Sequence, residues 1–357
     1  MLFLKSIKIR VLRGVIGISV IRVFEAFSGV GAQRMALRNI GVEHEVVGIS
    51  EIDKFAIQSY EAIHGKTLNF GDISKINPNE LPYFDLFTYS FPCQDLSTAG
   101  KQQGMIKRQT RSGLLYECEK IIEVKRPKYL LLENVKNLVG KKFKLAFEEW
   151  LVYLESLGYK NHWQVLNAKD FNIPQNRERV FVVSILEEHD KYIFPLEKIL
   201  EKRIKDILED RVDDKYYLTE EVTERLKPNK YVFPIKNGFI VYKGNDVELP
   251  CICASRGRNP DNPSVRAPGV PTEQRLEVNC KGVSNTLTTI QKDNYVIETN
   301  CRFRKLTPKE CWRLMGFKDE DFYKAKESGV SDSQLYKQAG NSIVVPVLER
   351  IFSELFK

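Results

Sequence analysis

The sequence has few of the residues on which metal centres and disulfide frameworks depend. It has four histidines without ligand spacing and seven cysteines, an odd number in no regular pattern. We therefore expect no disulfide scaffold, and a reducing compartment such as the cytoplasm suits this cysteine usage. Cys251 and Cys253, with Cys280 and Cys301, are an alternative metal site. Their Cys-x-Cys spacing is tighter than that of a zinc knuckle, so we predict no metal.

Long hydrophobic runs are also missing. Residues 1–20 are apolar, but interleaved Lys and Arg side chains break every stretch long enough to cross a bilayer. No small-residue cleavage site precedes the first predicted strand. We interpret residues 1–20 as an N-terminal extension and expect no membrane association. No internal repeat is evident.

The chain has 357 residues, with 55 Lys and Arg against 47 Asp and Glu, a net charge of +8. This length suits one large or two ordinary domains, and the positive balance permits a nucleic-acid partner without proving one. Apolar runs and helical runs alternate from residue 22 to residue 186. Strands are predicted over Val23–Phe27, Glu45–Ser50, Phe84–Tyr89, Tyr129–Glu133, Trp163–Asn167 and Val180–Ile185. Helices are predicted over Ala32–Asn39, Lys54–His64, Leu114–Val124 and Lys144–Leu157.

This alternation predicts an α/β fold with a doubly wound, mainly parallel sheet over residues 21–187, in which ligands bind at the carboxyl ends of the strands. The pattern then changes. Residues 198–212 predict a charged helix, and residues 231–300 are rich in Gly, Pro, Asn, Thr and Arg. We expect a smaller, mostly β domain over 188–303. Residues 304–357 return to helical patterning and should complete the first domain.

The segment Phe91-Pro92-Cys93-Gln94 follows a predicted buried strand. A proline directly before the cysteine fixes the backbone where the thiol emerges. The following loop is long, polar and basic, which suggests a nucleophile that is covered when an anionic substrate binds. The alternative for Cys93 alone is an ordinary buried thiol, because free cysteine is among the most buried residue types.

Glycines and carboxylates follow the first strands. Phe27-Ser28-Gly29-Val30-Gly31 opens the first helix, Glu51 lies after the second strand, and Gly71-Asp72-Ile73 follows a third segment. Such a carboxylate can accept hydrogen bonds from ribose hydroxyls. The third glycine of a dinucleotide fingerprint is missing, because position 34 is Arg, so S-adenosylmethionine fits better than NAD. Taken singly, each residue is equally well explained as a cap or turn.

The ordered set of motifs resembles the DNA (cytosine-5) methyltransferase family, particularly its bacterial and phage modification enzymes, from about Val23 to Phe356. The segments that carry the resemblance are Phe27-x-Gly29-x-Gly31, Glu51, Gly71-Asp72-Ile73, Pro92-Cys93-Gln94, Glu133-Asn134-Val135, Gln175-Asn176-Arg177-Glu178-Arg179-Val180, Arg304–Glu310 and Gln338–Ile343. The irregular 188–303 segment falls where that family has its target-recognition domain. Residues 21–187 and 304–357 would then form the catalytic domain.

The resemblance implies a role for each motif residue. The implied S-adenosylmethionine contacts are Phe27, Gly29, Gly31, Glu51, Asp72, Ile73, Pro92, Asn341 and Ser342. The implied catalytic residues are Cys93 as nucleophile, Glu133 as acid partner, and Arg177 and Arg179 as substrate-site arginines. The candidate DNA contacts are Ser97, Lys101, Arg111, Arg256 and Arg258. Two positions depart from the family pattern: Ile52 replaces an aromatic residue that often stacks on adenine, and Ala99 replaces a polar residue that some members carry.

The chemistry explains why these residue types are needed. C5 of cytosine is a poor nucleophile until a thiolate adds to C6, and a cysteine thiolate forms readily near cations. A protonated Glu133 beside N3 would relieve the negative charge that develops on the ring. The base must leave the duplex stack to reach the pocket. The implied activity is therefore methylation of a flipped cytosine in a short specific sequence of double-stranded DNA.

Four alternative functions agree less well with the sequence. The long 188–303 segment favours a DNA-reading domain over a tRNA-methylating enzyme. The presence of Cys93, Glu133 and Arg179 argues against a catalytically inactive relative. An amino-group methyltransferase requires an Asp/Asn-Pro-Pro-aromatic motif, which is absent. A nucleotide-dependent oxidoreductase is weakened by the missing third glycine. We expect a cytoplasmic monomer, with a cognate restriction endonuclease as a candidate partner.

Overall fold

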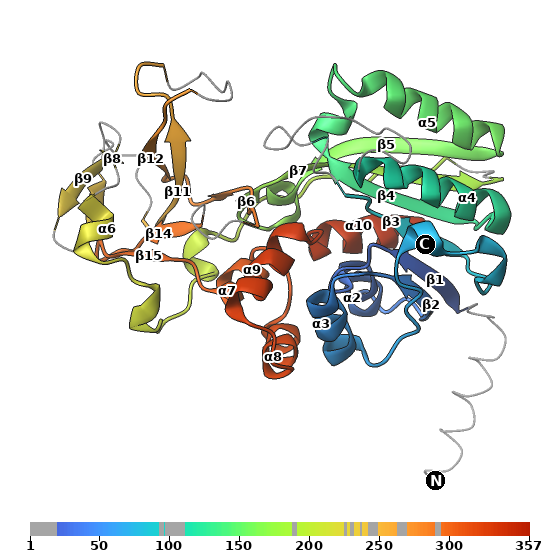
Figure 1. Cartoon of the computed structure of the whole chain (residues 1–357), viewed down its shortest axis with the longest axis horizontal. Helices are drawn as coiled ribbons and strands as arrows, with labels where there is room; N and C mark the ends of the chain where they lie inside the picture. Colours follow the sequence, from blue (N-terminus) through green and yellow to red (C-terminus); the bar gives the residue numbers. More distant parts are fainter. Residues whose placement is uncertain are drawn as a thin grey trace, which may run out of the picture.

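The computed structural model describes residues 20–92, 96, 111–187, 191–224, 227–228, 232–235, 238–241, 249–262, 270–289 and 294–357. Two lobes are visible, with a group of helices between them (Figure 1). The larger lobe contains a six-stranded sheet, and the smaller lobe contains a separate five-stranded sheet. The predicted α/β fold with a smaller β unit is therefore confirmed.

The large sheet has the strand order β2-β1-β3-β4-β7-β5. Its strands are β1 (Ile21–Ala26), β2 (His44–Ser50), β3 (Leu86–Tyr89), β4 (Tyr129–Val135), β5 (Tyr159–Asn167) and β7 (Glu178–Leu186). β1 pairs in parallel with β2 and β3, and β3 with β4, whereas β7 is antiparallel to both β4 and β5. The sheet is thus mainly parallel, and the carboxyl ends of β1 to β4 share one edge.

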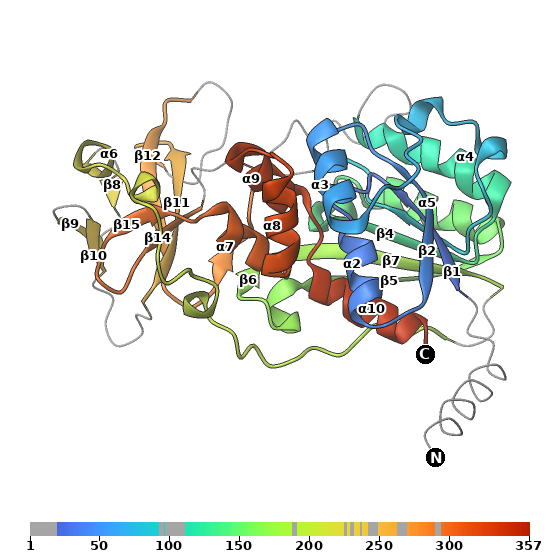
Figure 2. The same cartoon turned by 90° about the horizontal axis from the view of Figure 1, so that it is seen from below.

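Helices cover both faces of this sheet. One face carries α4 (Leu115–Lys125) and α5 (Lys144–Ser156), and the other carries α2 (Ala32–Asn39), α3 (Lys54–His64) and α10 (Val345–Leu355), as Figure 2 shows. Neighbouring residues of one strand enter opposite cores, because successive strand side chains point to opposite faces. Phe24 packs in the core with α4 and α5, whereas Val23 packs in the core with α2 and α10.

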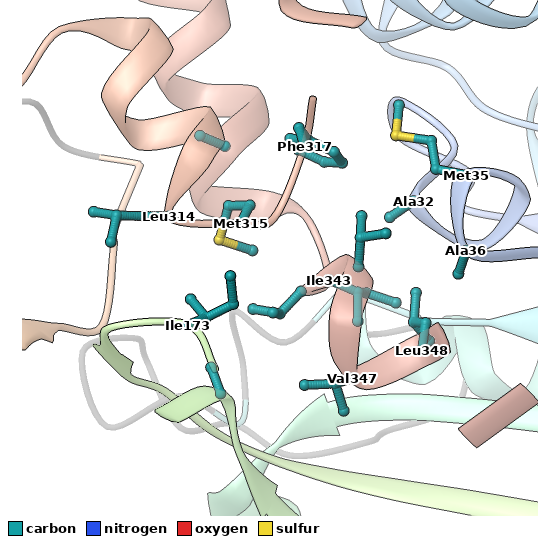
Figure 3. Close-up of a cluster of buried hydrophobic side chains, with 14 of the residues drawn as sticks. Ala32, Met35, Ala36, Ile173, Leu314, Met315, Phe317, Ile343, Val347 and Leu348 are labelled. Carbon is teal, nitrogen blue, oxygen red and sulfur yellow. The ribbon is translucent and has the colours of Figure 1, made fainter. Parts of the chain in front are cut away.

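The C-terminal segment is built into the core of the large lobe. Its helices α7 (Pro308–Arg313), α8 (Asp319–Glu327) and α9 (Asp332–Asn341) precede α10. Thr307 and Glu310 form a capping box at the start of α7. The buried cluster of Figure 3 includes Met35 of α2, Ile173, Met315 and Ile343. Side chains of the C-terminal helices therefore share a core with the first part of the chain.

The smaller lobe is mostly antiparallel, with the strand order β15-β14-β11-β12-β8. Its elements are α6 (Glu220–Glu224), β8 (Lys227–Pro228), β9 (Val232–Ile235), β10 (Gly238–Val241), β11 (Cys251–Arg258), β12 (Glu273–Asn279), β14 (Tyr295–Ile297) and β15 (Phe303–Lys305). A short parallel pair, β6 (Gln175–Asn176) with β13 (Ser284–Asn285), connects the lobes. The 3-10 turns are η1 (Ile73–Lys75), η2 (Pro78–Glu80), η3 (Arg111–Leu114), η4 (Lys136–Val139), η5 (Ala168–Phe171), η6 (Ile204–Asp206) and η7 (Asp214–Tyr216).

Two expectations differ from the structure. The helix predicted over 198–212 is not formed; this stretch contains only the short turn η6. Main-chain N–H groups of Lys198 and Glu201 donate instead to the Asp170 carbonyl and to Oδ1 of Asn172, so tertiary contacts replace helical hydrogen bonds. Cys251 and Cys280 form a disulfide that the irregular cysteine spacing did not predict.

Candidate functional site

A cavity of about 510 Å³ lies at the carboxyl ends of β1 to β4. It is closed on another side by the end of α9 and the residues that follow it. Eleven of the residues singled out in the sequence line it: Phe27, Gly29, Glu51, Asp72, Ile73, Pro92, Glu133, Arg177, Arg179, Asn341 and Ser342. Residues from both ends of the sequence therefore meet in one site, as expected for the switch region of a doubly wound sheet.

Glu51 holds the first two loops of this cavity together. Its Oε2 accepts a hydrogen bond of 2.9 Å from Gly29 N–H, and its Oε1 accepts from the N–H groups of Ile52 and Asp53, both at 2.9 Å. A carboxylate has about four acceptor positions, so one remains for a ligand hydroxyl. Asn69 fixes the backbone of Glu51 through hydrogen bonds in both directions.

The loop after β1 has a backbone that few residues tolerate. Phe27 has φ 55° and Gly29 has φ 56°, both in the left-handed region. This conformation turns the chain sharply into α2. Gly31 serves the packing of the loop, because a Cβ there would lie 2.5 Å from Nε2 of His64 and 2.7 Å from Cε2 of Tyr60. The glycine therefore permits α3 to approach.

Asp72 and Ile73 place a carboxylate beside an apolar side chain in the cavity wall. Asp72 Oδ1 accepts from the Ser74 hydroxyl at 2.8 Å and the Ser74 N–H at 3.0 Å, and these bonds lower the pKa of the Asp72 carboxyl. Ile73 is buried beside it. The ionised carboxylate and the apolar side chain can bind the amino group and the ring of an adenine.

Glu133 lies near the carboxyl end of β4, lines the cavity and is only 8% exposed. Its Oε1 lies 3.2 Å from Nε of Arg179. Burial raises the pKa of Glu133, and the charges of Arg179 and Arg177 and a hydrogen bond from Ser90 oppose this rise. The site thus favours a carboxyl group that can carry a proton beside an arginine.

Arg177 lies in the cavity wall but is held by the protein backbone. Its Nη1 donates to the Leu287 carbonyl at 3.0 Å. Its Nη2 donates to the carbonyls of Gly340 at 3.0 Å and Ser342 at 2.9 Å. The side chain is almost completely buried. This geometry suits a clamp between three chain segments, whereas Arg179 is the arginine that faces Glu133.

The chain on either side of the predicted nucleophile is anchored by two asparagines. Asn134 Nδ2 donates to the Phe91 carbonyl at 3.0 Å, and Asn137 Nδ2 donates to the Leu96 carbonyl at 2.6 Å. Both asparagines come from the end of β4 and the turn after it. Cys93, Ser97, Ala99 and Lys101 lie outside the described residues. Arg111 begins η3, but its side chain is also outside them.

The candidate recognition arginines are paired with a carboxylate. Arg256 and Arg258 lie on β11, opposite β12. Both contact Glu277: Nε of Arg256 lies 3.7 Å from Oε2, and Arg258 contacts Oε1. Their charges are therefore partly neutralised here, and contact with a phosphate or a base would compete with Glu277.

Sequence reasoning gave no role to four residues that shape the site: Ser90, Asn137, Lys337 and Gln338, the last of which begins one of the motifs. Lys337 Nζ lies 2.6 Å from Oδ2 of Asp53, so an ion pair joins α9 to the start of α3 beside the cavity. Gln338 Nε2 donates to the Phe55 carbonyl at 2.9 Å. Their proximity to established motifs was the only available signal, because such contacts depend on tertiary structure.

Among the described residues, no group of three or more His, Cys, Asp or Glu side chains is placed to hold a metal ion. The helices in this part of the chain are all too short or too polar to cross a membrane.

Similar sequences occur in proteins named as type II or orphan methyltransferases. The Type II methyltransferase M2.ScrFI of Lactococcus lactis subsp. cremoris is 40% identical, with 94% of this chain and 99% of the relative covered. The orphan methyltransferase M.SPBetaI of Bacillus phage SPbeta is 36% identical, with 94% and 98% covered. The Type II methyltransferase M.Bsp6I of a Bacillus species is 33% identical, with 94% and 99% covered.

Solved structures agree in fold. A Spodoptera frugiperda DNMT2 mutant has a TM-score of 0.64 at 17% identity, covering 95% of this chain and all (100%) of the other. A putative DNA modification methyltransferase from an Escherichia coli prophage has a TM-score of 0.61 at 19% identity, covering 95% and 99%. The description "C-5 cytosine-specific DNA methylase" belongs to the family that matches residues 21–357. Together with the sequence relatives, this match shows that the chain belongs to the C-5 cytosine-specific DNA methylase family.

Proposed function

We propose that this DNA (cytosine-5-)-methyltransferase acts on a flipped cytosine within a short specific sequence of duplex DNA, through a covalent bond between Cys93 and C6. The observation that carries the proposal is the single cavity that holds Glu51, Asp72, Glu133 and Arg179. Two carboxylates suited to adenosine thus lie in the same space as a carboxyl–arginine pair suited to a base. Pro92, directly before Cys93, lines the same cavity.

The cavity fits the cofactor of the family, S-adenosylmethionine. Glu51 retains acceptor capacity for ribose hydroxyls, Asp72 is held ionised by Ser74, and Phe27 and Ile73 supply apolar surface. Asn341 and Ser342 would contact the cofactor from the opposite wall, and Gly29 and Gly31 keep the loop close. When bound, S-adenosylmethionine supplies a methyl group on a positively charged sulfur.

The chain's own residues would prepare the cytosine. Cys93 adds as a thiolate to C6, and Glu133 donates its proton toward N3 as electron density moves into the ring. Arg179 stabilises the base and holds Glu133, while Arg177 fixes the walls of the site. After methylation, a base removes the C5 proton and the C6–sulfur bond breaks, which restores the aromatic ring and releases Cys93.

We assign DNA recognition to residues 188–303, with catalysis in residues 21–187 and 304–357. Ser97, Lys101 and Arg111 would contact the DNA near the flipped base, and Arg256 and Arg258 would do so from the smaller lobe. The enzyme would act as a monomer in the cytoplasm, beside a cognate restriction endonuclease if the source cell has one. Exchange of residues 190–300 with those of a related enzyme should transfer the donor's target sequence; an unchanged target would contradict the assignment.

The covalent step is tested with DNA that contains 5-fluorocytosine. Fluorine cannot leave as a proton, so the wild-type enzyme should remain bound to the DNA as a complex stable to denaturation. Cys93→Ala should form no such complex and lose methyl transfer, while it still binds S-adenosylhomocysteine. Comparable methylation by the alanine variant would exclude Cys93 as the nucleophile. Bisulfite sequencing of plasmid DNA methylated by the wild-type enzyme would give the target sequence.

A further inference from the structure

His64 is the last residue of α3, and its side chain contacts the loop between β1 and α2. Its Nε2 lies 3.1 Å from the carbonyl oxygen of Val30, which stands between Gly29 and Gly31 in that loop. A carbonyl oxygen only accepts hydrogen bonds, so Nε2 must carry the hydrogen and donate it. The contact spans 34 positions of the sequence and reaches the cavity, because Val30 is one of its lining residues.

The imidazole ring is itself held in place. Its centroid lies 4.7 Å from that of the Tyr60 ring, one turn earlier on the same face of α3. Tyr60 is buried, and its hydroxyl donates to Oε2 of Glu25 in β1 at 2.6 Å. Gly31 leaves room for the ring, because a Cβ there would lie 2.5 Å from Nε2 of His64. The end of α3 is therefore joined both to β1 and to the loop that follows it.

The loop has a backbone that needs such support. Phe27 has φ 55°, a conformation that persists in a non-glycine residue only where the surroundings fix it. Glu51 holds one side of the loop, since its Oε2 accepts from Gly29 N–H at 2.9 Å. His64 holds the other side through Val30. A loop without this support would have to be ordered when a ligand binds, and that cost would lower the affinity.

His64 is uncharged at neutral pH. Burial lowers its pKa to about 3, and the hydrogen bond to Val30 acts in the opposite direction. Three cations add to the lowering: Arg34, Arg38 and Lys324. A neutral imidazole carries one hydrogen, and the Val30 carbonyl places it on Nε2. An uncharged amide group at the same position could therefore replace the ring as a donor.

We propose that His64 is a positioning residue for cofactor binding: by donating from Nε2 to the Val30 carbonyl, it holds loop 27–31 in the shape that binds S-adenosylmethionine. This inference rests on the proposed function, in which the cavity beside this loop holds the cofactor. His64 acts on the cofactor only through the backbone of the loop. Its loss should therefore change the affinity for the cofactor and leave the chemical step unchanged.

The first test compares binding with turnover. His64→Phe keeps an aromatic ring beside Tyr60 but removes the donor, so the dissociation constant of S-adenosylhomocysteine, measured by calorimetry, should rise roughly threefold to tenfold. KM for S-adenosylmethionine should rise by the same factor at unchanged kcat, which is the pattern of lost ground-state binding. Wild-type affinity in this variant, or a lower kcat at unchanged KM, would overturn the proposal.

Two amide variants test the hydrogen bond without an aromatic ring. The amide nitrogen of glutamine lies about as far from Cα as Nε2 of histidine does, so His64→Gln should bind S-adenosylhomocysteine within about twofold of the wild type. His64→Asn is one methylene shorter and cannot reach Val30, so it should lose as much affinity as His64→Phe. Equal affinities of the glutamine and asparagine variants would overturn the role of the hydrogen bond.

His44 provides the matched control. Its Nδ1 lies 2.7 Å from the Val42 carbonyl, but it begins β2, at the opposite end of the sheet from the cavity. His44→Phe should therefore leave KM and the affinity for S-adenosylhomocysteine unchanged. An equal loss of affinity in His44→Phe would assign the effect to a general loss of stability and overturn the proposal.

Asp72→Ala separates this proposal from the proposed function. If the cavity holds the cofactor, this variant should bind S-adenosylhomocysteine roughly tenfold more weakly or worse, because a hydrogen bond to a charged group is lost. Wild-type affinity in Asp72→Ala would refute the cofactor site itself. Weak binding by Asp72→Ala combined with wild-type binding by His64→Phe would leave that site intact and refute only the role of His64.

Discussion

Nη2 of Arg177 lies 2.9 Å from the carbonyl oxygen of Ser342, which joins the residue before β7 to the residue after α9. The same guanidinium also binds Leu287 and Gly340 carbonyls. An arginine that sequence reasoning assigned to the substrate thus donates to three carbonyls in two other parts of the chain. Its loss should first affect the stability of the cavity.

Arg177→Lys should lower the free energy of unfolding by roughly 2–4 kcal/mol, because one ammonium group cannot replace a planar fork that serves three carbonyls. Urea unfolding would measure this loss. Arg179→Lys is the matched control: it alters a partly exposed side chain that faces Glu133, so it should reduce methyl transfer with little effect on stability. Equal stability of the two variants would contradict the conclusion that Arg177 stabilises the fold by joining separate segments.

Gly340→Ala should destabilise the fold although it lies within a helix. Alanine normally favours a helix over glycine by about 0.5–1 kcal/mol. Here the added Cβ would lie 2.7 Å from the Thr288 carbonyl carbon and oxygen and from Thr289 N, so backbone would have to move. We expect a lower melting temperature and weaker S-adenosylhomocysteine binding by calorimetry. A more stable variant would contradict this expectation and show that the backbone at 288–289 can move away at little cost.

Lys337→Met should weaken cofactor binding slightly, because the ion pair with Asp53 joins two walls of the cavity. The lysine is 46% exposed, so the effect should stay below about 1 kcal/mol and decrease with added salt. Lys326→Met is the control, since its partner Asp332 contributes no lining to the cavity. Calorimetry at low and high salt would measure both. Equal effects of the two substitutions would contradict a role for Lys337 in the site.

Glu25 should make the protein less stable as pH rises. Burial raises its pKa from 4.5 to about 7, although Tyr60 donates a hydrogen bond of 2.6 Å to it. The folded chain therefore binds this proton more strongly than the unfolded chain does. The resulting stabilisation is fully present below pH 4.5, decreases as the pH rises, and is lost above about pH 7. The loss is on the order of 3 kcal/mol at most. In Glu25→Gln, the free energy of unfolding measured in urea should depend less on pH in this range. If its pH dependence were unchanged, groups other than Glu25 would be responsible for it.

Local pattern was enough to predict the elements that position the site. The predicted helices Ala32–Asn39 and Lys54–His64 agree with α2 and α3 at both ends. Their ends are fixed locally: Asp53 caps α3 by accepting from Phe55 N–H, and a glycine with positive φ follows His64. Strand ends and glycine turns are likewise encoded in a few neighbouring residues, so the wall of the cavity could be anticipated.

Contacts between distant segments could not be predicted in the same way. The pairing of Arg256 and Arg258 with Glu277 depends on the register of β11 and β12. The stretch at 198–212 has the composition of a helix, yet Asn172 and Asp170 bind its main-chain N–H groups. The three carbonyls around Arg177 come from residues more than 100 positions away. The sequence shows where the arginines are, but it does not show which carboxylates or carbonyls they contact in the folded chain.

The position of Asn341 and Ser342 in the cavity wall has a consequence for protein synthesis. A ribosome makes β1 to β4, with Glu51, Asp72 and Glu133, long before it makes the segment that closes their cavity. A nascent chain can therefore fold much of the large sheet while it still lacks one wall of this cavity, the proposed site for the methyl donor. Only a chain that has been translated past Ser342 can close the site, so a product released before that point would not become an active modifier of the genome.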